Sequence, residues 1–325
     1  MTSALNNPQS AIRNPQSAVQ HFITVAETPD NVLHRIFDVA FKLRAERAAG
    51  KRNDPVLAGK TLAMIFEKPS LRTNVSFQQA MYELGGNCIV MVSEQVGLGK
   101  RESPADVARV LSGMVHGIMA RVFEHQKLIE LAEYSTIPVI NALSDYSHPC
   151  QALADAMTMM DEFGRDLKGR TLAFVGDGNN VAHSLAVMCG RLGMNFVLAS
   201  PPGYEITAEV QDTIMRYCPD LNLEVTQDAA DAVRYADAIY ADTWISMGQE
   251  AEAAARKHAF KDFQVNEALL ARAPEQCIVL HCLPAYRNVE ITDGVLDGPR
   301  SRVFPQAHNR LHAQKGLLAV LMGNV

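Results

Sequence analysis

Short apolar runs alternate with segments of helical periodicity along most of this chain, which leaves few folds open to it. Thr61–Phe66 is an apolar run, and apolar residues at helical spacing follow it from Phe77 to Leu84. Similar runs and helical segments lie at 32–49, 86–92, 104–114, 117–123, 126–134 and 137–142. Strands that alternate with helices in this way predict a parallel sheet.

The alternation restarts after Gln151, with a helix at 152–163, a strand ending in the loop GDGNN, a helix at 181–192 and later strands in ADAIYADTW and CIVLHCLP. We therefore predict an α/β fold of two doubly wound parallel-sheet domains with an interdomain cleft. The predicted domains are 20–151 and 152–306, with a C-terminal helix at 307–323 that packs back on the first domain. Ligands of such sheets bind beyond the carboxyl ends of the strands, so we expect the site in the cleft.

Two of the predicted helices have a one-sided apolar pattern. In 104–114 the apolar residues share one face, which consists of Val107, Val110, Leu111 and Met114. The closing segment, 309–322, is likewise predicted to be an amphipathic helix.

The composition excludes several classes of protein. The 325 residues are 48% hydrophobic and 20% charged, which suits two domains with buried cores. A net charge of −6 argues against a nucleic-acid partner, and no apolar run approaches the length of a membrane span. The six cysteines form no CxxC pair and no zinc-type cluster, so we expect no metal and reduced thiols in a cytoplasmic protein.

A short polar repeat opens the chain. NPQSAI at 7–12 recurs as NPQSAV at 14–19. A repeat of this composition buries no core, so 1–19 is interpreted as a disordered tail rather than a docking segment.

The stretch FEKPSLRTNVSF concentrates polar groups where a strand gives way to a helix. Ser70, Arg72 and Thr73 fall on the predicted first turn of the helix that follows 61–66. The N–H groups and partial positive charge of a helix N-terminus attract phosphate, and a guanidinium adds a forked cation. Taken alone, the cluster fits two interpretations equally, a phosphate site or an N-cap serine beside solvated charges.

Further polar residues at strand ends favour the phosphate interpretation. Arg121 lies inside the apolar run IMARVF, where an arginine without a partner is costly, so it is expected to face an anion or a carboxylate. His148 and Gln151, in SHPCQALAD, fall at the predicted junction between the domains.

A second set of polar residues follows the strands of the second domain. GDGNNVAHS lacks the third glycine of a dinucleotide fingerprint, because Val181 stands there, so Asn179 and Asn180 are assigned to a different ligand. Asp242, Ser246 and Met247 follow one strand, in DTWISMGQE. His281, Cys282 and Arg287 follow another, in HCLPAYR. An acid, an amide, a loop of backbone donors and a thiol suit a ligand that carries an amine and a carboxylate.

Taken together, these motifs resemble those of the carbamoyltransferase family, and the ornithine carbamoyltransferases in particular. The resemblance covers nearly the whole chain after the tail, and six motifs occur in the family's order: SLRT, the arginine of IMARVF, HPCQ, GDGNN, DTWISMG with HCLP, and FPQAHNRLHAQK.

The resemblance implies a site for each substrate, with carbamoyl phosphate and L-ornithine as partners and no cofactor. The implied carbamoyl phosphate residues are Ser70, Leu71, Arg72, Thr73, Arg121, His148, Gln151, Cys282, Leu283 and Arg310. The implied ornithine residues are Asn180, Asp242, Ser246 and Met247. The implied catalytic residues are Arg72, Arg121, His148, Asp242 and Cys282. The products would be L-citrulline and phosphate, and the implied assembly is a homotrimer, or a multiple of trimers, with shared active sites.

Two positions depart from the family pattern. Asn74 stands where the family usually has a second arginine after Ser-x-Arg-Thr, for which altered packing is expected rather than lost activity. Gly97 stands where the loop that reaches a neighbouring subunit usually has a glutamine. Gln95 and Lys100 are the candidate substitutes for that donor.

Three alternatives remain at this point. One is a carbamoyltransferase for another amine, such as putrescine or N-acetylornithine. The second is a dinucleotide-dependent dehydrogenase, disfavoured by Val181 and by the absence of a ribose-binding acid after the next strand. The third is a non-catalytic paralogue, for which Asn74 and Gly97 would be signs of a degraded site.

Overall fold

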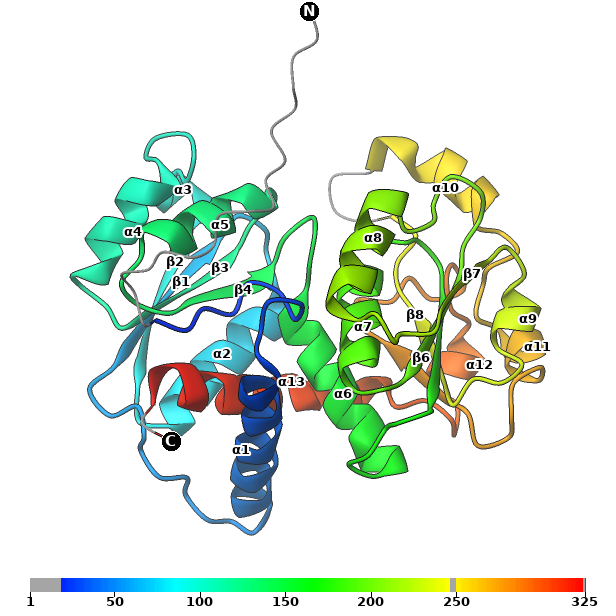
Figure 1. Ribbon diagram of the computed structural model, residues 1–325, viewed down its shortest axis with the longest axis horizontal. Helices are drawn as coiled ribbons and strands as arrows, with labels where there is room; N and C mark the ends of the chain where they lie inside the picture. Colours follow the sequence, from blue (N-terminus) through cyan, green and yellow to red (C-terminus); the bar gives the residue numbers. More distant parts are fainter. Residues whose placement is uncertain (1–18, 246–249, 324) are drawn as a thin grey trace, which may run out of the picture.

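Two parallel sheets lie on either side of a pair of long helices, α6 (Pro149–Phe163) and α13 (Val303–Met322), as Figure 1 shows. The structure is a computed structural model that describes residues 19–245, 250–323 and 325. The prediction of two doubly wound parallel-sheet domains is confirmed. The predicted tail, 1–19, lies outside the described residues apart from Val19.

The first sheet has the strand order β2-β1-β3-β4 and is parallel throughout. Its elements are β1 (Thr61–Phe66), β2 (Asn87–Val92), β3 (Gly117–Arg121) and β4 (Val139–Leu143), with α1 (Asp30–Ala48), α2 (Leu71–Glu83), α3 (Ser93–Val96), α4 (Pro104–Ser112) and α5 (His125–Tyr134). The chain leaves β1 toward β2 on one side and returns to β3 on the other. The adjacent carboxyl ends of β1 and β3, where Phe66 pairs with Arg121, are therefore a topological switch point.

The second sheet has the order β7-β6-β5-β8-β9 and a switch point between β5 and β8. Its strands are β5 (Thr171–Val175), β6 (Asn195–Ala199), β7 (Leu223–Thr226), β8 (Ala238–Ala241) and β9 (Ile278–His281). Its helices are α7 (Asn180–Arg191), α8 (Ala208–Tyr217), α9 (Ala229–Ala232), the 3₁₀ turn η1 (Glu250–Glu252), α10 (Ala253–Ala259), α11 (Glu267–Leu270) and α12 (Asp293–Leu296). Neither β7 nor α8 was among the predicted elements.

One hydrophobic core runs through both halves of the molecule. It joins residues of the first sheet, such as Met64, to residues of the second, such as Phe174, through the buried side chains of α6 and α13. α13 packs against α1, α2 and α6, and at Gly316 it approaches α1 so closely that a Cβ atom would lie 2.5 Å from the carbonyl oxygen of Ile36. The domain boundaries at 151/152 and 306/307 stay a prediction.

The prediction that α13 is amphipathic is wrong. Buried residues occur on every side of the helix, because α1, α2 and α6 surround it. No helix of the described residues, α13 included, is both long and apolar enough to cross a membrane.

The predicted apolar face of α4 is only partly buried. Val107 is buried, but Val110 is 48% exposed, and Met114, which follows the end of the helix at Ser112, is 74% exposed. The helix instead buries its neighbouring residues Ala105 and Ala108.

Candidate active site

The N-terminus of α2 begins at the carboxyl end of β1, as the sequence predicts. Ser70 is the N-cap, with an extended backbone, and its Oγ accepts a hydrogen bond from the backbone N–H of Thr73 at 3.3 Å. Thr73 is fully buried, whereas the side chain of Leu71 points to the surface and is 73% exposed. Ser70 therefore caps α2, and the N-terminus of this helix also faces the carboxyl end of the first sheet.

Three guanidinium groups gather around this helix start. Arg121 ends β3 and is 7% exposed, and Arg310 on α13 is 2% exposed. The pKa of Arg121 is lowered to about 10 by burial and by the positive charges of Arg310 and Arg72. Among the described residues, none of the three arginines forms an ion pair with a carboxylate, and Arg121 Nε has no hydrogen-bond partner. Buried like charges without a counter-ion are costly, so the arrangement favours a bound anion.

Arg310 is held in place from two sides. Its Nη1 donates to Gln151 Oε1 at 2.6 Å and its Nη2 donates to Thr73 Oγ1 at 3.2 Å. Residues predicted from three separate motifs thus meet in one hydrogen-bonded group.

Lys68 adds a further cation that the predicted site did not include. It is 9% exposed, and its Nζ lies 4.3 Å from the centre of the Phe123 ring. Burial and the charge of Arg121 lower the pKa of Lys68. Its position just after β1, two residues before Ser70, is the sequence signal that could have added Lys68 to the predicted phosphate site.

His148 is the N-cap residue of α6 and is buried beside the arginines. Burial, followed by the charges of Arg310 and Arg121, holds the pKa of His148 well below its usual range, so its imidazole is neutral at pH 7. Its Nδ1 has no partner among the described residues. A neutral imidazole donates one hydrogen bond and accepts another.

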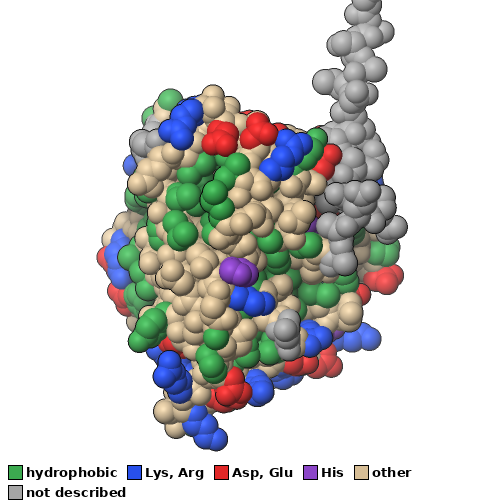
Figure 2. Space-filling view, turned by 90° about the vertical axis from the view of Figure 1, so that its left-hand side faces the viewer, with side chains coloured by type: hydrophobic (Ala, Val, Ile, Leu, Met, Phe, Trp, Pro, Cys, Tyr) green, Lys and Arg blue, Asp and Glu red, His purple; other side chains and the backbone are tan. Residues whose placement is uncertain are grey.

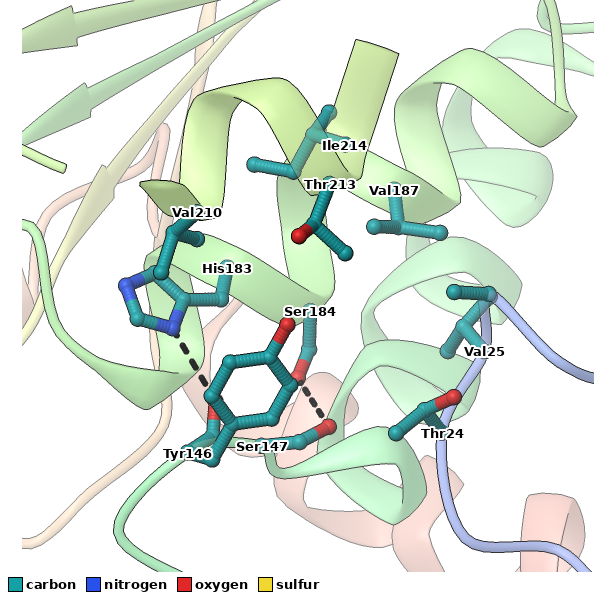
Figure 3. Close-up of a pocket in the computed structure, with 11 residues that line it drawn as sticks. Thr24, Val25, Tyr146, Ser147, His183, Ser184, Val187, Val210, Thr213 and Ile214 are labelled. Carbon is teal, nitrogen blue, oxygen red and sulfur yellow. Dashed lines mark hydrogen bonds between the residues drawn. The ribbon is translucent and has the colours of Figure 1, made fainter. Parts of the chain in front are cut away.

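The loop before His148 is held by α7 of the second domain. Ser184 Oγ accepts a hydrogen bond from the backbone N–H of His148 at 2.8 Å and lies 3.0 Å from Ser147 Oγ. Figure 3 shows the contact between Ser147 and Ser184 and a second one, in which His183 Nδ1 lies 3.0 Å from the carbonyl oxygen of Tyr146. The cavity drawn there, of about 20 Å³, borders Ser147 and is separate from the arginine cluster.

Asp242 and Cys282 meet at the carboxyl ends of β8 and β9. Cys282 Sγ donates to Asp242 Oδ1 at 2.9 Å, and Asn179 Nδ2 donates to Asp242 Oδ2 at 2.8 Å. Burial and the Asp242 carboxylate hold the pKa of the Cys282 thiol well above its usual range. Cys282 is therefore a protonated thiol at neutral pH, whose proton is directed at Asp242.

The two groups of residues act on each other electrostatically. The positive charge of Arg72 lowers the pKa of Cys282, against the larger effects of burial and Asp242. The arginine cluster and the Asp242–Cys282 pair are therefore close enough in space to affect each other electrostatically.

The remaining predicted residues are Asn180, Leu283, Ser246 and Met247. Asn180 Nδ2 donates to the carbonyl oxygen of Ser144 at 2.6 Å, so Asn179, rather than Asn180, contacts Asp242. Leu283 has a positive φ of 56°, and its N–H donates to His281 Nδ1 at 2.9 Å. Ser246 and Met247 lie outside the described residues.

Arg287 does not join the site that the HCLPAYR motif suggested. Its guanidinium pairs at the surface with Asp293 at 2.5 Å and with Asp297 at 2.6 Å.

Comparison with known proteins covers nearly all of the chain. Residues 20–161 match the model of the aspartate/ornithine carbamoyltransferase carbamoyl-P binding domain, and residues 168–321 match that of the Asp/Orn binding domain. The chain belongs to the aspartate/ornithine carbamoyltransferase family.

Relatives in this family are similar in sequence and in structure. An ornithine carbamoyltransferase of Anoxybacillus flavithermus is 48% identical over 303 residues, which are 93% of this chain and 96% of the relative. One from Methanopyrus kandleri is 46% identical over 305 residues, covering 93% and 97%. The solved structure of the ornithine carbamoyltransferase from Pyrococcus furiosus superposes with a TM-score of 0.90 at 45% identity, covering 94% of this chain and 98% of that one.

The two departures from the family pattern are Asn74, on the first turn of α2, and Gly97, after α3. Asn74 Oδ1 accepts from Gln78 Nε2 at 2.5 Å on the exposed side of α2. Gly97 ends α3 with a positive φ of 63°, a conformation that glutamine adopts only with strain. Gln95 Oε1 accepts from the backbone N–H of Val92 at 3.1 Å.

Proposed function

We propose that this chain is a carbamoyltransferase that moves the carbamoyl group of carbamoyl phosphate to the δ-amine of L-ornithine, giving L-citrulline and phosphate. The observation that carries the proposal is the cluster of Arg72, Arg121 and Arg310, which form no ion pair among the described residues. Arg121 and Arg310 are buried, Arg72 is half-buried, and the pair of Asp242 and Cys282 lies near them. The family membership and the names of the relatives support the same reaction.

The phosphoryl group is assigned to the N-terminus of α2 and the arginines. Ser70 and Thr73 supply hydroxyl groups and the first turn of α2 supplies N–H groups, while Arg72, Arg121 and Arg310 supply the positive charge. Negative charge that develops on the leaving phosphate is thus stabilised by groups already in place, without reorganisation of water.

The carbamoyl oxygen is assigned to His148. A neutral imidazole at this place donates a hydrogen bond to the oxygen on which negative charge develops when the amine attacks. Gln151 and the turn at Leu283 complete the carbamoyl phosphate set, as the family resemblance implies.

The amine is assigned to the Asp242–Cys282 side of the cleft. A δ-amine with a pKa near ~10.4 is mostly protonated at pH 7, and its neutral form costs roughly 4 to 5 kcal/mol. Asp242 is the acceptor for the proton of the δ-amine. Cys282 does not take this role, because burial and the Asp242 carboxylate keep its thiol protonated. Asn180, with Ser246 and Met247, is assigned to the α-amino and carboxylate groups of ornithine.

We further propose a homotrimer, or a multiple of trimers, in which neighbouring chains share active sites. The edge strand β2 and the adjacent α2 expose a set of large apolar side chains, namely Leu71, Val75, Tyr82, Ile89, Val90 and Val92. Figure 2 looks onto this end of the molecule and shows hydrophobic groups between charged ones. An exposed apolar edge strand is a site for association, and α3 with its loop is next to β2.

A cytoplasmic location is proposed as well, since all six cysteines are free thiols, which suits a reducing compartment.

The test of the reaction is citrulline formation by the purified chain, with carbamoyl phosphate held constant and three amines compared. The proposal predicts fast turnover with ornithine and little with putrescine or N-acetylornithine. Faster turnover with either of the other amines would reassign the substrate. No turnover with any amine by a folded oligomer would indicate a non-catalytic paralogue.

A further inference from the structure

A buried carboxylate that the proposed reaction does not use lies between the two domains. Asp155 is fully buried on α6, one helical turn after Gln151. Its Oδ1 accepts from Gln151 Nε2 at 2.7 Å and from Gln306 Nε2 at 2.6 Å, and its Oδ2 accepts from the Tyr240 hydroxyl at 3.1 Å. Three donors from α6, α13 and β8 thus converge on one side chain.

The contact with Asp155 decides which way the Gln151 amide points. The amide nitrogen faces the Asp155 carboxylate, and the amide oxygen faces Arg310 Nη1 at 2.6 Å. A guanidinium only donates, and Asp155 Oδ1 acts as an acceptor toward both glutamine amides, so just one orientation of the Gln151 amide satisfies both neighbours. Reversing it would bury two mismatched pairs, at a cost of about 1–3 kcal/mol for each unsatisfied group.

The amide of Gln306 is fixed by the same oxygen. Its nitrogen faces Asp155 Oδ1, and its oxygen accepts from the backbone N–H of His281 at 2.9 Å, directly before Cys282. Asp155 Oδ1 therefore orients two amides. The Gln151 amide contacts an arginine of the cluster, and the Gln306 amide contacts the end of β9.

We propose that Asp155 is a positioning residue that orients Arg310 for the phosphoryl group through the amide of Gln151. It acts as a hydrogen-bond acceptor and not as the counter-ion of Arg310, because no ion pair joins the two and Gln151 lies between them. This inference rests on the proposed function, since it takes Arg310 to be a phosphate ligand.

The experiment compares three variants of the full-length chain with the wild type. Binding of inorganic phosphate and of carbamoyl phosphate is measured by calorimetry, and citrulline formation gives KM and kcat. D155N keeps an oxygen that accepts from both glutamine amides, so its affinities should stay within about threefold of the wild type. D155A removes the acceptor, and both affinities should fall by about tenfold or more, with KM for carbamoyl phosphate rising in parallel.

The matched control is Y240F, which removes the donor to Oδ2 and leaves the contacts of Asp155 with both glutamines intact. Y240F also removes the long hydrogen bond that Gln306 Nε2 donates to the Tyr240 hydroxyl at 3.3 Å, but no contact of Gln151. Its phosphate affinity should equal that of the wild type.

The proposal is overturned if D155A binds phosphate with the affinity of the wild type. It is overturned as well if D155N binds phosphate as weakly as D155A, since the charge of Asp155 and not its acceptor oxygen would then matter. It is also overturned if Y240F binds phosphate as weakly as D155A, because any change around Asp155 would then lower the affinity. D155L, which fills the volume without an acceptor, replaces D155A if circular dichroism shows D155A to be unfolded. A wild type that binds phosphate and makes no citrulline would refute the proposed function and leave the Asp155 test intact.

Discussion

Arg72, Arg121 and Arg310 come from three segments that are distant in the chain, and the fold places them together at the start of α2, with Arg121 and Arg310 buried and Arg72 half-buried. Each one raises the cost of burying the others, which a single negative ligand offsets. The sign of the ligand charge therefore follows from the residues alone, before any likeness to other proteins is considered.

Removing one of these guanidinium groups should impair the reaction strongly. R72A is expected to lower kcat/KM for carbamoyl phosphate by about 10²-fold or more, the usual loss when a donor to developing charge is deleted. R287A is the matched control, because Arg287 pairs with Asp293 and Asp297 at the surface, and it should keep wild-type rates. Near-full turnover by R72A in steady-state kinetics would refute the phosphate assignment.

Cys282 is placed as a hydrogen-bond donor and not as a nucleophile. Its raised pKa leaves little thiolate at pH 7.5, so iodoacetamide should not inactivate the enzyme quickly. C282S keeps a donor to Asp242 and should retain activity within about tenfold, whereas D242N should lose about 10²-fold or more. Rapid alkylation of Cys282 at pH 7.5, followed by mass spectrometry, would contradict this assignment.

At the scale of elements, α7 holds the loop that carries His148. The hydroxyl of Ser184, on α7, accepts from the backbone N–H of His148, the N-cap residue of α6. S184A leaves that N–H without its partner, so kcat should fall by about tenfold while KM for ornithine changes little.

S200A is the control for S184A. Ser200 is equally buried in the second domain, but its Oγ donates to the carbonyl oxygen of Tyr204 at 2.8 Å, away from the cleft. Equal losses of kcat in S184A and S200A would show that the effect is general destabilisation.

The elements that the sequence predicts best are those with a strong apolar pattern. β1 was predicted residue for residue, since TLAMIF is buried almost throughout. β7 is not predicted, because none of its residues, LEVT, is buried and they form no apolar run. α13 was misjudged because its neighbours α1, α2 and α6 are set by tertiary structure, which periodicity does not report.

The site residues, like the elements, divide into those that the sequence locates and those that only the structure places. Ser70, Arg121 and His148 stand at element ends that motif and pattern both locate. The contact of Asn179 with Asp242 depends on the geometry of one loop, in which Asn179 also caps α7 through its side chain. Asp155 lies within a helix that is buried on all sides, where no periodicity separates a structural residue from a functional one.

At the scale of the whole molecule, the apolar side chains of α2 and β2 need a cover. Tyr82 is 74% exposed on α2, and Y82E should replace a trimer by monomers in size-exclusion chromatography with light scattering, with loss of shared active sites. Y235E is the matched control, since Tyr235 is 77% exposed on the second domain. A wild type that is monomeric at micromolar concentration would contradict the proposed assembly.

Asp155 should also give the global stability a recognisable pH dependence. Burial raises its pKa from the ordinary value of 3.8 to about 7, against the opposing effects of Gln306, Gln151, Tyr240 and Arg310. Between these two values the folded chain binds more protons than the unfolded chain, so stability falls as pH rises through this window.

D155N lacks this titration. From pH 5.5 to pH 8 the wild type should lose about 2 kcal/mol more unfolding free energy than D155N, measured in urea. Parallel pH profiles for the two proteins would show that the pKa of Asp155 is not raised.

The transfer of one carbon atom is the centre of the proposed function. The most direct measurement is ¹³C NMR of the purified wild type with [¹³C]carbamoyl phosphate and L-ornithine. The label should move into the ureido carbon of citrulline, much faster than in R72A or in buffer. Label that remains in carbamoyl phosphate, or that appears only in bicarbonate from hydrolysis, would contradict the account.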